Sequence, residues 1–136
     1  MDETWYMKVE AIVFDKIKKK SEPVLKPVYP NIIFTTSEVT EKPSQFPCVE
    51  IRELPGVEKG NTLVNDEVSA YLSTFQVNVY SEISKQVARD VMAEIALHFK
   101  RDIAFSMVAM PTYTKFDGIH RYTARFRRML GGGDKL

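Results

Sequence analysis

One cysteine and two histidines are the residues of this sequence that could supply a nucleophile and its base. Cys48 is the only cysteine and directly follows Pro47, whereas the histidines are His98 and His120. A thiolate activated by an imidazole is a common nucleophilic pair. No feature of the sequence holds either histidine near the cysteine. We therefore expect Cys48 to be a small, half-buried strand residue, and His98 to cap a carbonyl or face solvent at a helix end.

Motifs for other chemistry do not occur in the sequence. It has no glycine-rich phosphate loop, no pair of cysteines or histidines at metal-ligand spacing and no nucleophile elbow. We therefore expect neither enzymatic activity nor a cofactor nor a bound metal. Four methionines are expected to fill gaps in the core or in an interface. They are Met92, Met107, Met110 and Met129.

The length and charge of the chain limit the possible partners. With 136 residues it has room for one domain, expected over residues 1–130, with a flexible tail at 131–136. Lysine and arginine total 19 against 18 acidic residues, so a net charge of +1 gives no field over the whole molecule. No apolar run is long enough to span a membrane, and the acidic start "MDETWYMKVE" is unlike a signal peptide. We expect synthesis in the cytoplasm and no membrane partner.

The first half of the chain predicts one helix and two strands. A helix is expected over residues 3–19, with Lys18–Lys20 in its last turn, where cations suit the helix dipole. Three prolines then restrict residues 28–38 to an edge or irregular strand around 32–36. The segment 46–54 predicts a strand, and "PGVEKGNTLVNDE" at 55–67 predicts a polar loop within a longer excursion over 53–68.

The second half predicts a strand, a helix and a closing hairpin. Apolar and polar residues alternate over 70–81, and residues 81–102 carry an apolar helical stripe with Ser84 as its N-cap. Strands over 103–115 and 119–130 are joined at Asp117-Gly118, a strong hairpin signal. The expected fold is α+β, a mostly antiparallel four- to five-stranded sheet with two main helices packed on one face.

The last predicted strand separates apolar from basic residues. Period-two alternation places Arg121, Thr123, Arg125 and Arg127 on the face opposite to Tyr122, Ala124 and Phe126. Three interpretations remain open. The arginines could pair with acids of a neighbouring strand such as Glu50 or Glu53, they could line a ring lumen or subunit joint, or they could bind nucleic acid.

Several segments carry a family resemblance over roughly residues 28–130. These are "TTSEVTEKPSQFPCVEIRE", with its Phe-Pro strand opener, "STFQVNVYSEISKQVARDVMAEI", in which a strand leads into a helix, and the terminal "HRYTARFRRML", with the pair Arg121 and Tyr122. In these features the chain resembles the tail-terminator, or tail-completion, proteins of long-tailed bacteriophages.

The resemblance implies a structural role in the virion. Such a protein forms a homo-oligomeric ring, commonly of six subunits, which caps the tail tube and contacts the head-tail connector, with possible passage of DNA through the lumen. It would be assembled in the host cytoplasm and reside in the tail or neck of the virion. The residues we expect at the subunit interface or lumen are Arg121, Arg125, Arg127, Glu58, Lys59 and Asn61. The alternative is a small nucleic-acid-binding module that uses the basic last strand.

Overall fold

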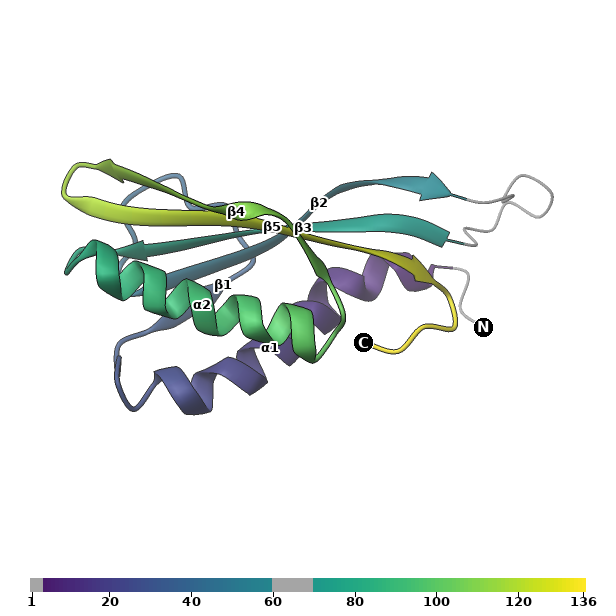
Figure 1. The fold of residues 1–136 in the computed structure, drawn as a ribbon, viewed down its shortest axis with the longest axis horizontal. Coiled ribbons are helices and arrows are strands. Elements are labelled where there is room, and N and C mark those ends of the chain that lie inside the picture. The colour runs from purple at the N-terminus through teal and green to yellow at the C-terminus, as the bar shows by residue number, and fades with distance from the viewer. Residues whose placement is uncertain (1–3, 60–69) are drawn as a thin grey trace.

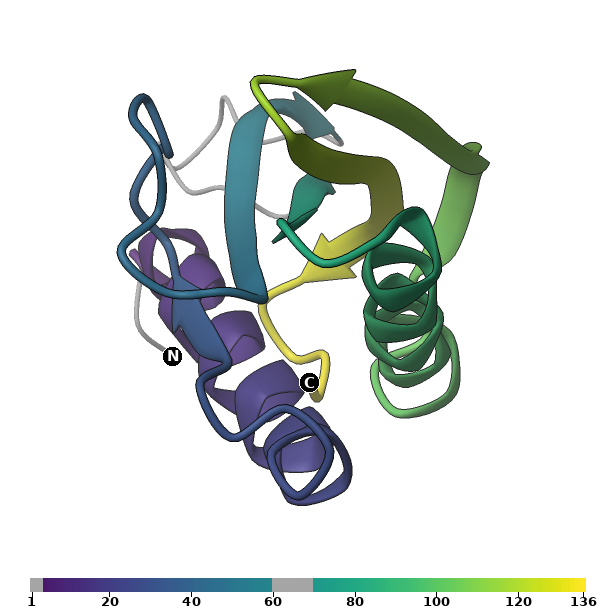
Figure 2. The ribbon, with the colours of Figure 1, turned by 90° about the vertical axis from the view of Figure 1, so that its left-hand side faces the viewer.

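The computed structural model describes residues 4–59 and 70–136 and has an α+β fold. Its elements in chain order are the 3-10 helix η1 (Trp5–Lys8), α1 (Val9–Leu25), β1 (Ile33–Thr35), β2 (Cys48–Lys59), β3 (Ala70–Ser81), α2 (Lys85–Arg101), β4 (Ser106–Phe116) and β5 (Ile119–Gly131). Figures 1 and 2 show both main helices on the same side of the curved sheet. The expected fold class is confirmed.

The strands form one mixed sheet in the order β1-β2-β3-β5-β4. β1 runs parallel to β2, and every other neighbouring pair is antiparallel. Because β3 and β4 are both antiparallel to β5, they run parallel to each other, and α2 is the crossover between them. The helix returns over the sheet and covers the face below β3, β5 and β4 (Figure 1).

The core lies between the helices and this covered face of the sheet. Four phenylalanine rings form its centre, namely Phe75, Phe99, Phe105 and Phe126. The rings of Phe99 on α2 and Phe126 on β5 stack with their centroids 4.5 Å apart, and Phe105 meets Phe99 edge-on at 5.6 Å. All four side chains are buried, so this cluster fixes α2 against β3 and β5.

Helix α1 is longer than the sequence predicts. It continues through Pro23 to Leu25, so Lys18–Lys20 lie within the helix and the expected end at residue 19 is wrong. Proline inside a helix removes one backbone hydrogen bond. The buried stripe nevertheless continues at a spacing of four residues through Ser21 to Leu25, and this packing offsets the lost bond. Ser21 Oγ also donates to the carbonyl oxygen of Ile17 at 2.6 Å.

Strand β2 is also longer than predicted, since it runs to Lys59 and not to residue 54. Its pairing with β3 shifts between Leu54 and Val57, where an irregularity accommodates Pro55 and Gly56. The predicted loop at 55–67 is therefore wrong for residues 55–59. Glu58 and Lys59 belong to the strand and pair in register with Tyr71 and Ala70, whereas Asn61 lies outside the described residues.

Two local predictions for the second half are confirmed. Ser84 Oγ accepts a hydrogen bond from Val87 N at 3.2 Å and caps the N-terminus of α2. Asp117 and Gly118 have φ values of 49° and 76°, and they connect β4 to β5 in a tight turn. A type I′ hairpin turn requires positive φ at both positions, and Gly118 adopts its value without steric cost.

The last residues lie against the end of β5 and against α1. Arg128 Nη1 donates to the carbonyl oxygens of Ile103 and Lys135 at 2.9 and 3.2 Å, and Lys16 Nζ donates to that of Leu136 at 2.8 Å. These contacts link the tail to α1 and to the segment after α2; its expected flexibility stays a prediction. Within residues 4–59 and 70–136, no helix has the length and apolar character needed to cross a membrane.

Candidate functional site

The candidate site is the face of the sheet that the helices leave uncovered, which we call the open face. Alternation along β5 buries Tyr122, Ala124 and Phe126 on the covered side and leaves Arg125 and Arg127 exposed on the other, as the sequence predicts. The strand register then assigns further members of the open face on β2, β3 and β5. They are Cys48, Glu50 and Arg52 of β2, Thr74, Gln76, Asn78 and Tyr80 of β3, and Arg121 and Thr123 of β5.

The segment between β1 and β2, residues 36–47, packs on one half of the open face. Val39 and Phe46 of this segment pack against a small buried cluster formed by Cys48, Tyr80 and Ile119. The cluster is separate from the main core, which lies on the other side of the sheet. We call this part of the open face the half under the segment. The part around Arg52, Arg125 and Arg127 is the bare half.

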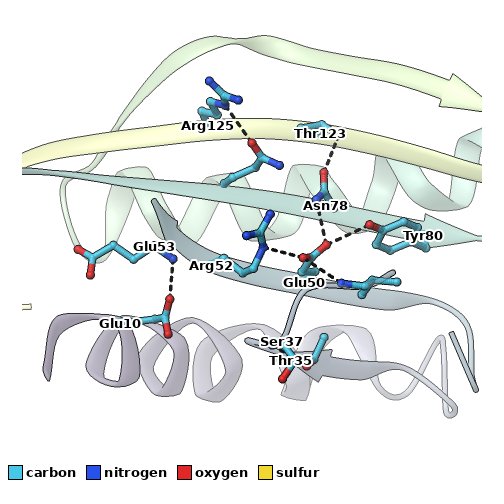
Figure 3. A network of polar contacts seen from close by, with 12 residues as sticks. Glu10, Thr35, Ser37, Glu50, Arg52, Glu53, Asn78, Tyr80, Thr123 and Arg125 are labelled. Atoms are coloured by element: carbon cyan, nitrogen blue, oxygen red, sulfur yellow. Dashed lines mark hydrogen bonds and ion pairs between the residues drawn. The ribbon is translucent and has the colours of Figure 1, made fainter. Parts of the chain in front are cut away.

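A buried carboxylate stands at the border between the two halves. Glu50 is 1% exposed, and its oxygens accept four hydrogen bonds (Figure 3). The donors are Arg52 Nε at 2.7 Å, Asn78 Nδ2 at 2.9 Å, Tyr80 OH at 3.0 Å and the backbone N–H of Val39 at 3.3 Å. Burial and the negative charge of Glu50 raise the pKa of Tyr80 well above its usual range. The carboxylate therefore ties β2, β3 and the covering segment together.

The other carboxylate considered as a partner for the arginines lies on the opposite side of the sheet. Glu53 accepts hydrogen bonds from Tyr71 OH at 2.6 Å and from Ser73 Oγ at 2.7 Å. Its backbone N–H donates to Glu10 Oε2 at 2.8 Å, which joins β2 to α1 (Figure 3). Glu10 and Glu53 are 43 residues apart, so sequence pattern alone gave no signal for this contact.

The arginines of β5 make no ion pair with these acids. Arg125 Nε donates to Gln76 Oε1 at 3.0 Å (Figure 3), and Arg121 Nε donates to Thr114 Oγ1 at 3.0 Å, with its guanidinium 5.3 Å from the centre of the Phe116 ring. Arg127 has no ion pair within the described part of the chain. The interpretation that Glu50 or Glu53 neutralises the last strand is therefore wrong, because Glu50 pairs instead with Arg52 on its own strand.

Register brings Arg52 into the same group as two of the predicted arginines. Arg52, Gln76 and Arg125 are paired neighbours on β2, β3 and β5, and Arg127 is two residues further along β5. Adjacent strands lie about 4.8 Å apart and alternate residues about 6.7 Å apart along a strand, so these three arginines share one small area. We call them the arginine cluster. Sequence reasoning missed Arg52, since its place depends on how β2 pairs with β3.

The arginine cluster can bind anionic groups. Each guanidinium offers several N–H donors in a planar fork that suits carboxylates and phosphates. Glu50 offsets one of the three charges, and the other two belong to exposed side chains. The bare half of the open face is thus a basic, hydrogen-bonding surface on rigid strands.

The thiol of Cys48 is buried in the sheet, and the ring of His120 contacts a tyrosine. Cys48 is 1% exposed, more buried than expected, and burial together with the charge of Glu50 raises the pKa of its thiol to about 11. His120 Nδ1 lies 2.7 Å from Tyr113 OH. Residues 4–59 and 70–136 contain no group of three or more His, Cys, Asp or Glu side chains that could hold a metal ion.

His98 differs from its predicted place. It is buried on α2, with Nε2 2.6 Å from Glu94 Oε2 and Nδ1 2.5 Å from Asp102 Oδ2. The expectation that it caps a carbonyl or faces solvent is therefore wrong. These three residues are spaced four apart, which places them on one helix face. The two contacts join residues of successive helical turns, so the group reinforces the last turns of α2.

Comparison with known proteins adds no identification. No protein-family model matches the chain, and a search of curated proteins finds no significant match.

Proposed function

We propose that this protein is a structural component of a bacteriophage virion, a ring-forming tail terminator that caps the tail tube and joins the tail to the head connector. The observation that carries the proposal is the arginine cluster on a sheet face that the helices leave open. The sequence supports the proposal through the resemblance of residues 28–130 to tail-terminator proteins. In this role the protein acts by assembly and not by catalysis.

Ring formation gives the arginine cluster a physical consequence. A ring repeats the same surface in every subunit, so six copies would place about eighteen arginines around one axis. Like charges at that density need compensation by acids of neighbouring subunits or by a polyanion such as DNA. Within the described residues of one subunit, Glu50 alone offers such compensation, and it pairs with Arg52. The cluster therefore suits a lumen or a subunit joint better than an isolated surface.

The remaining expected contacts fit into the same proposal. Glu58 and Lys59 belong to the end of β2 that leads away from the covering segment, and we propose that they, with Asn61, contact a neighbouring subunit or the tail tube. Arg121 is held by Thr114 and Phe116, so we assign it a supporting position beside the cluster. The proposed partners are further copies of this chain, the tail tube protein and the connector protein.

A second candidate function is a small nucleic-acid-binding module. It is favoured by Arg127, which is exposed and has no ion pair within the described part of the chain. Few phosphate contacts would be available to one subunit, so binding by a monomer would be modest and would weaken steeply with salt. A DNA mobility shift that persists for a protein shown to be monomeric, and that falls with added salt, would favour this candidate.

The deciding experiment is to measure the oligomeric state. Native mass measurement and electron microscopy are carried out on the protein alone and mixed with tail tube protein. We expect closed rings in at least the mixed sample. A protein that stays monomeric under both conditions would contradict the proposal.

A triple substitution then tests the arginines of β5, two of which, Arg125 and Arg127, belong to the arginine cluster. Replacing Arg121, Arg125 and Arg127 by glutamine should change the stability of the monomer by only about 0.5 kcal/mol per site, because such positions are outside the core. Ring formation or DNA passage should be altered. The matched control replaces the exposed residues Lys19, Lys20 and Lys26 by glutamine, which removes the same charge from the α1 side of the molecule. Normal assembly of the arginine variant would show that these arginines of β5 have no role in the ring, which would contradict the proposed role of the arginine cluster.

A further inference from the structure

A groove of about 540 Å³ lies between α2 and β4, on a different part of the molecule from the arginine cluster. Its walls are mainly apolar, and they include Ala93 and Leu97 from α2 and Met107, Met110 and Pro111 from β4. A groove of this size and character is typical of binding sites.

Two large apolar side chains of the groove are unusually exposed. Met110 is 78% exposed and Leu97 is 42% exposed, although both belong to regular elements. Grouped exposed apolar residues are uncommon on a protein that has no partner. Methionine side chains also adapt their shape to an incoming surface, which suits a docking groove.

The charges of the groove are of one sign. The two charged residues that line it are Arg89 and Lys100, and no acidic residue of the described chain lines it. Both belong to α2 and are eleven residues apart, which corresponds to about 16 Å along the helix axis. Between them the exposed line of α2 is apolar, at Ala93 and Leu97. An occupant that complements this wall needs apolar residues in the middle and acidic residues at both ends.

An added strand would fit this place poorly. β4 is the last strand of the sheet, but its pairing with β5 shifts between Met107 and Ala109 and again between Ala109 and Thr112. Pro111 in the same stretch has no N–H to donate to a further strand. Irregularities and proline protect strand edges from pairing with other chains. The groove therefore favours an occupant that binds through side chains, and a helix lying beside α2 does so.

The described helices of a second copy do not supply this occupant. The apolar stripes of α1 and α2 are already buried against the sheet, at Val9, Val13 and Ile17 in α1 and at Val91, Ile95 and Phe99 in α2. The exposed surface of α1 carries Ile12 and Asp15 as well, but it is mainly basic through Lys19, Lys20 and the C-cap residue Lys26, which would repel the basic rim. The charge pattern thus points to a different protein.

We propose that the groove between α2 and β4 binds an amphipathic helix of another protein, one with apolar residues at helical spacing between acidic residues about eleven positions apart. This inference does not depend on ring formation, because it concerns a different surface. Failure of the ring measurement leaves the groove test intact, and the converse also holds.

The test uses two designed, fluorescein-labelled helical peptides of equal length. The first places leucines on one face between glutamates eleven residues apart, and the second has lysines in place of those glutamates. Binding to the full chain is followed by fluorescence anisotropy at low salt. We expect saturable binding of the acidic peptide and at least tenfold weaker binding of the basic one.

Two variants locate the binding. Met110→Asp should weaken the acidic peptide at least tenfold, whereas the control Met129→Asp, at an exposed methionine outside the groove, should leave binding unchanged. The double variant Arg89→Glu with Lys100→Glu should reverse the preference in favour of the basic peptide. Circular dichroism confirms that each variant is folded.

Three outcomes would overturn the proposal. These are no saturable binding of the acidic peptide, equal binding by Met110→Asp and the parent protein, and self-association of the protein that Met110→Asp abolishes. The last result would place a second copy in the groove.

Discussion

Arg52 and Glu50 stand two residues apart on β2 and are joined on the open face of the sheet, with Arg52 Nε 2.7 Å from Glu50 Oε2. The arginine side chain is 27% exposed and the glutamate 1% exposed, so the charged pair spans the border between interior and solvent. Because Glu50 also accepts the N–H of Val39, the pair holds the covering segment 36–47 on the sheet. One ion pair thus links the candidate basic surface to the folded position of a long connection.

We expect Glu50→Gln to destabilise the protein. The amide keeps the shape of the side chain but removes the charge that compensates Arg52, and it cannot accept all of the present hydrogen bonds. Loss of one partner of a buried, hydrogen-bonded charge costs about 2–4 kcal/mol, discounted here because Arg52 reaches solvent. Urea unfolding measures the change. The control Glu82→Gln breaks an exposed 3.7 Å pair with Lys42 and should cost less than about 0.5 kcal/mol. Equal effects of the two substitutions would contradict the role of Glu50.

Cys48 is expected to be unreactive in the native protein. Its thiol is buried and its pKa is raised to about 11, so little thiolate exists at neutral pH. A thiol reagent such as 5,5′-dithiobis(2-nitrobenzoate) should label it at least a hundredfold more slowly in buffer than in urea. Cys48→Ala should cost about 1–2 kcal/mol as a modest core truncation and leave assembly intact. Loss of assembly by a folded Cys48→Ala protein would reopen the case for a functional thiol.

Ala104→Gly is expected to stabilise the protein. Ala104 follows α2 with a φ of 56°, while Phe105 N donates to the Phe99 carbonyl at 2.8 Å, a helix ending that usually carries glycine. Glycine relieves the strain of the left-handed conformation, but it also adds conformational entropy to the unfolded chain. Because the first free energy is larger, the free energy of unfolding should rise by about 0.5–1 kcal/mol. Thermal melting tests this. The control Ala109→Gly, in β4 without positive φ, should lower stability, and a lower melting temperature for Ala104→Gly would refute the argument.

Asp102 should make stability depend on acid pH. The hydrogen bond from His98 lowers the pKa of this carboxyl below its ordinary value of 3.8 and outweighs the effect of burial. A lowered folded-state pKa stabilises the protein above the unfolded value, and this contribution is lost as the pH falls through the folded value. Asp102→Asn should therefore melt below the parent protein at pH 6, and the difference should shrink below about pH 4. Asp15→Asn, on the exposed side of α1, is the control and should leave the melting temperature at pH 6 nearly unchanged.

Sequence pattern was sufficient where local rules decide the structure. The alternation over 70–81, the cap at Ser84 and the Asp117-Gly118 turn each depend on residues close in the chain, and all three are found in the structure. The same alternation correctly separated Arg125 and Arg127 from the buried Phe126. Local patterns failed at the ends of elements. Pro23 and the Pro55-Gly56 pair indicated breaks, but packing and strand pairing carried α1 and β2 past them.

The tertiary structure alone decided which distant residues meet. Arg52 joins Arg125 because β2 and β5 both pair with β3, and this register depends on contacts across the whole sheet. Glu50 is buried because the segment 36–47 packs on it, which no property of the strand itself indicates. The sequence by itself therefore determined the types of element and the face on which each strand side chain lies, since these follow from backbone periodicity. The partners of each charge were decided by folding, because pairing brings together residues that the chain keeps far apart.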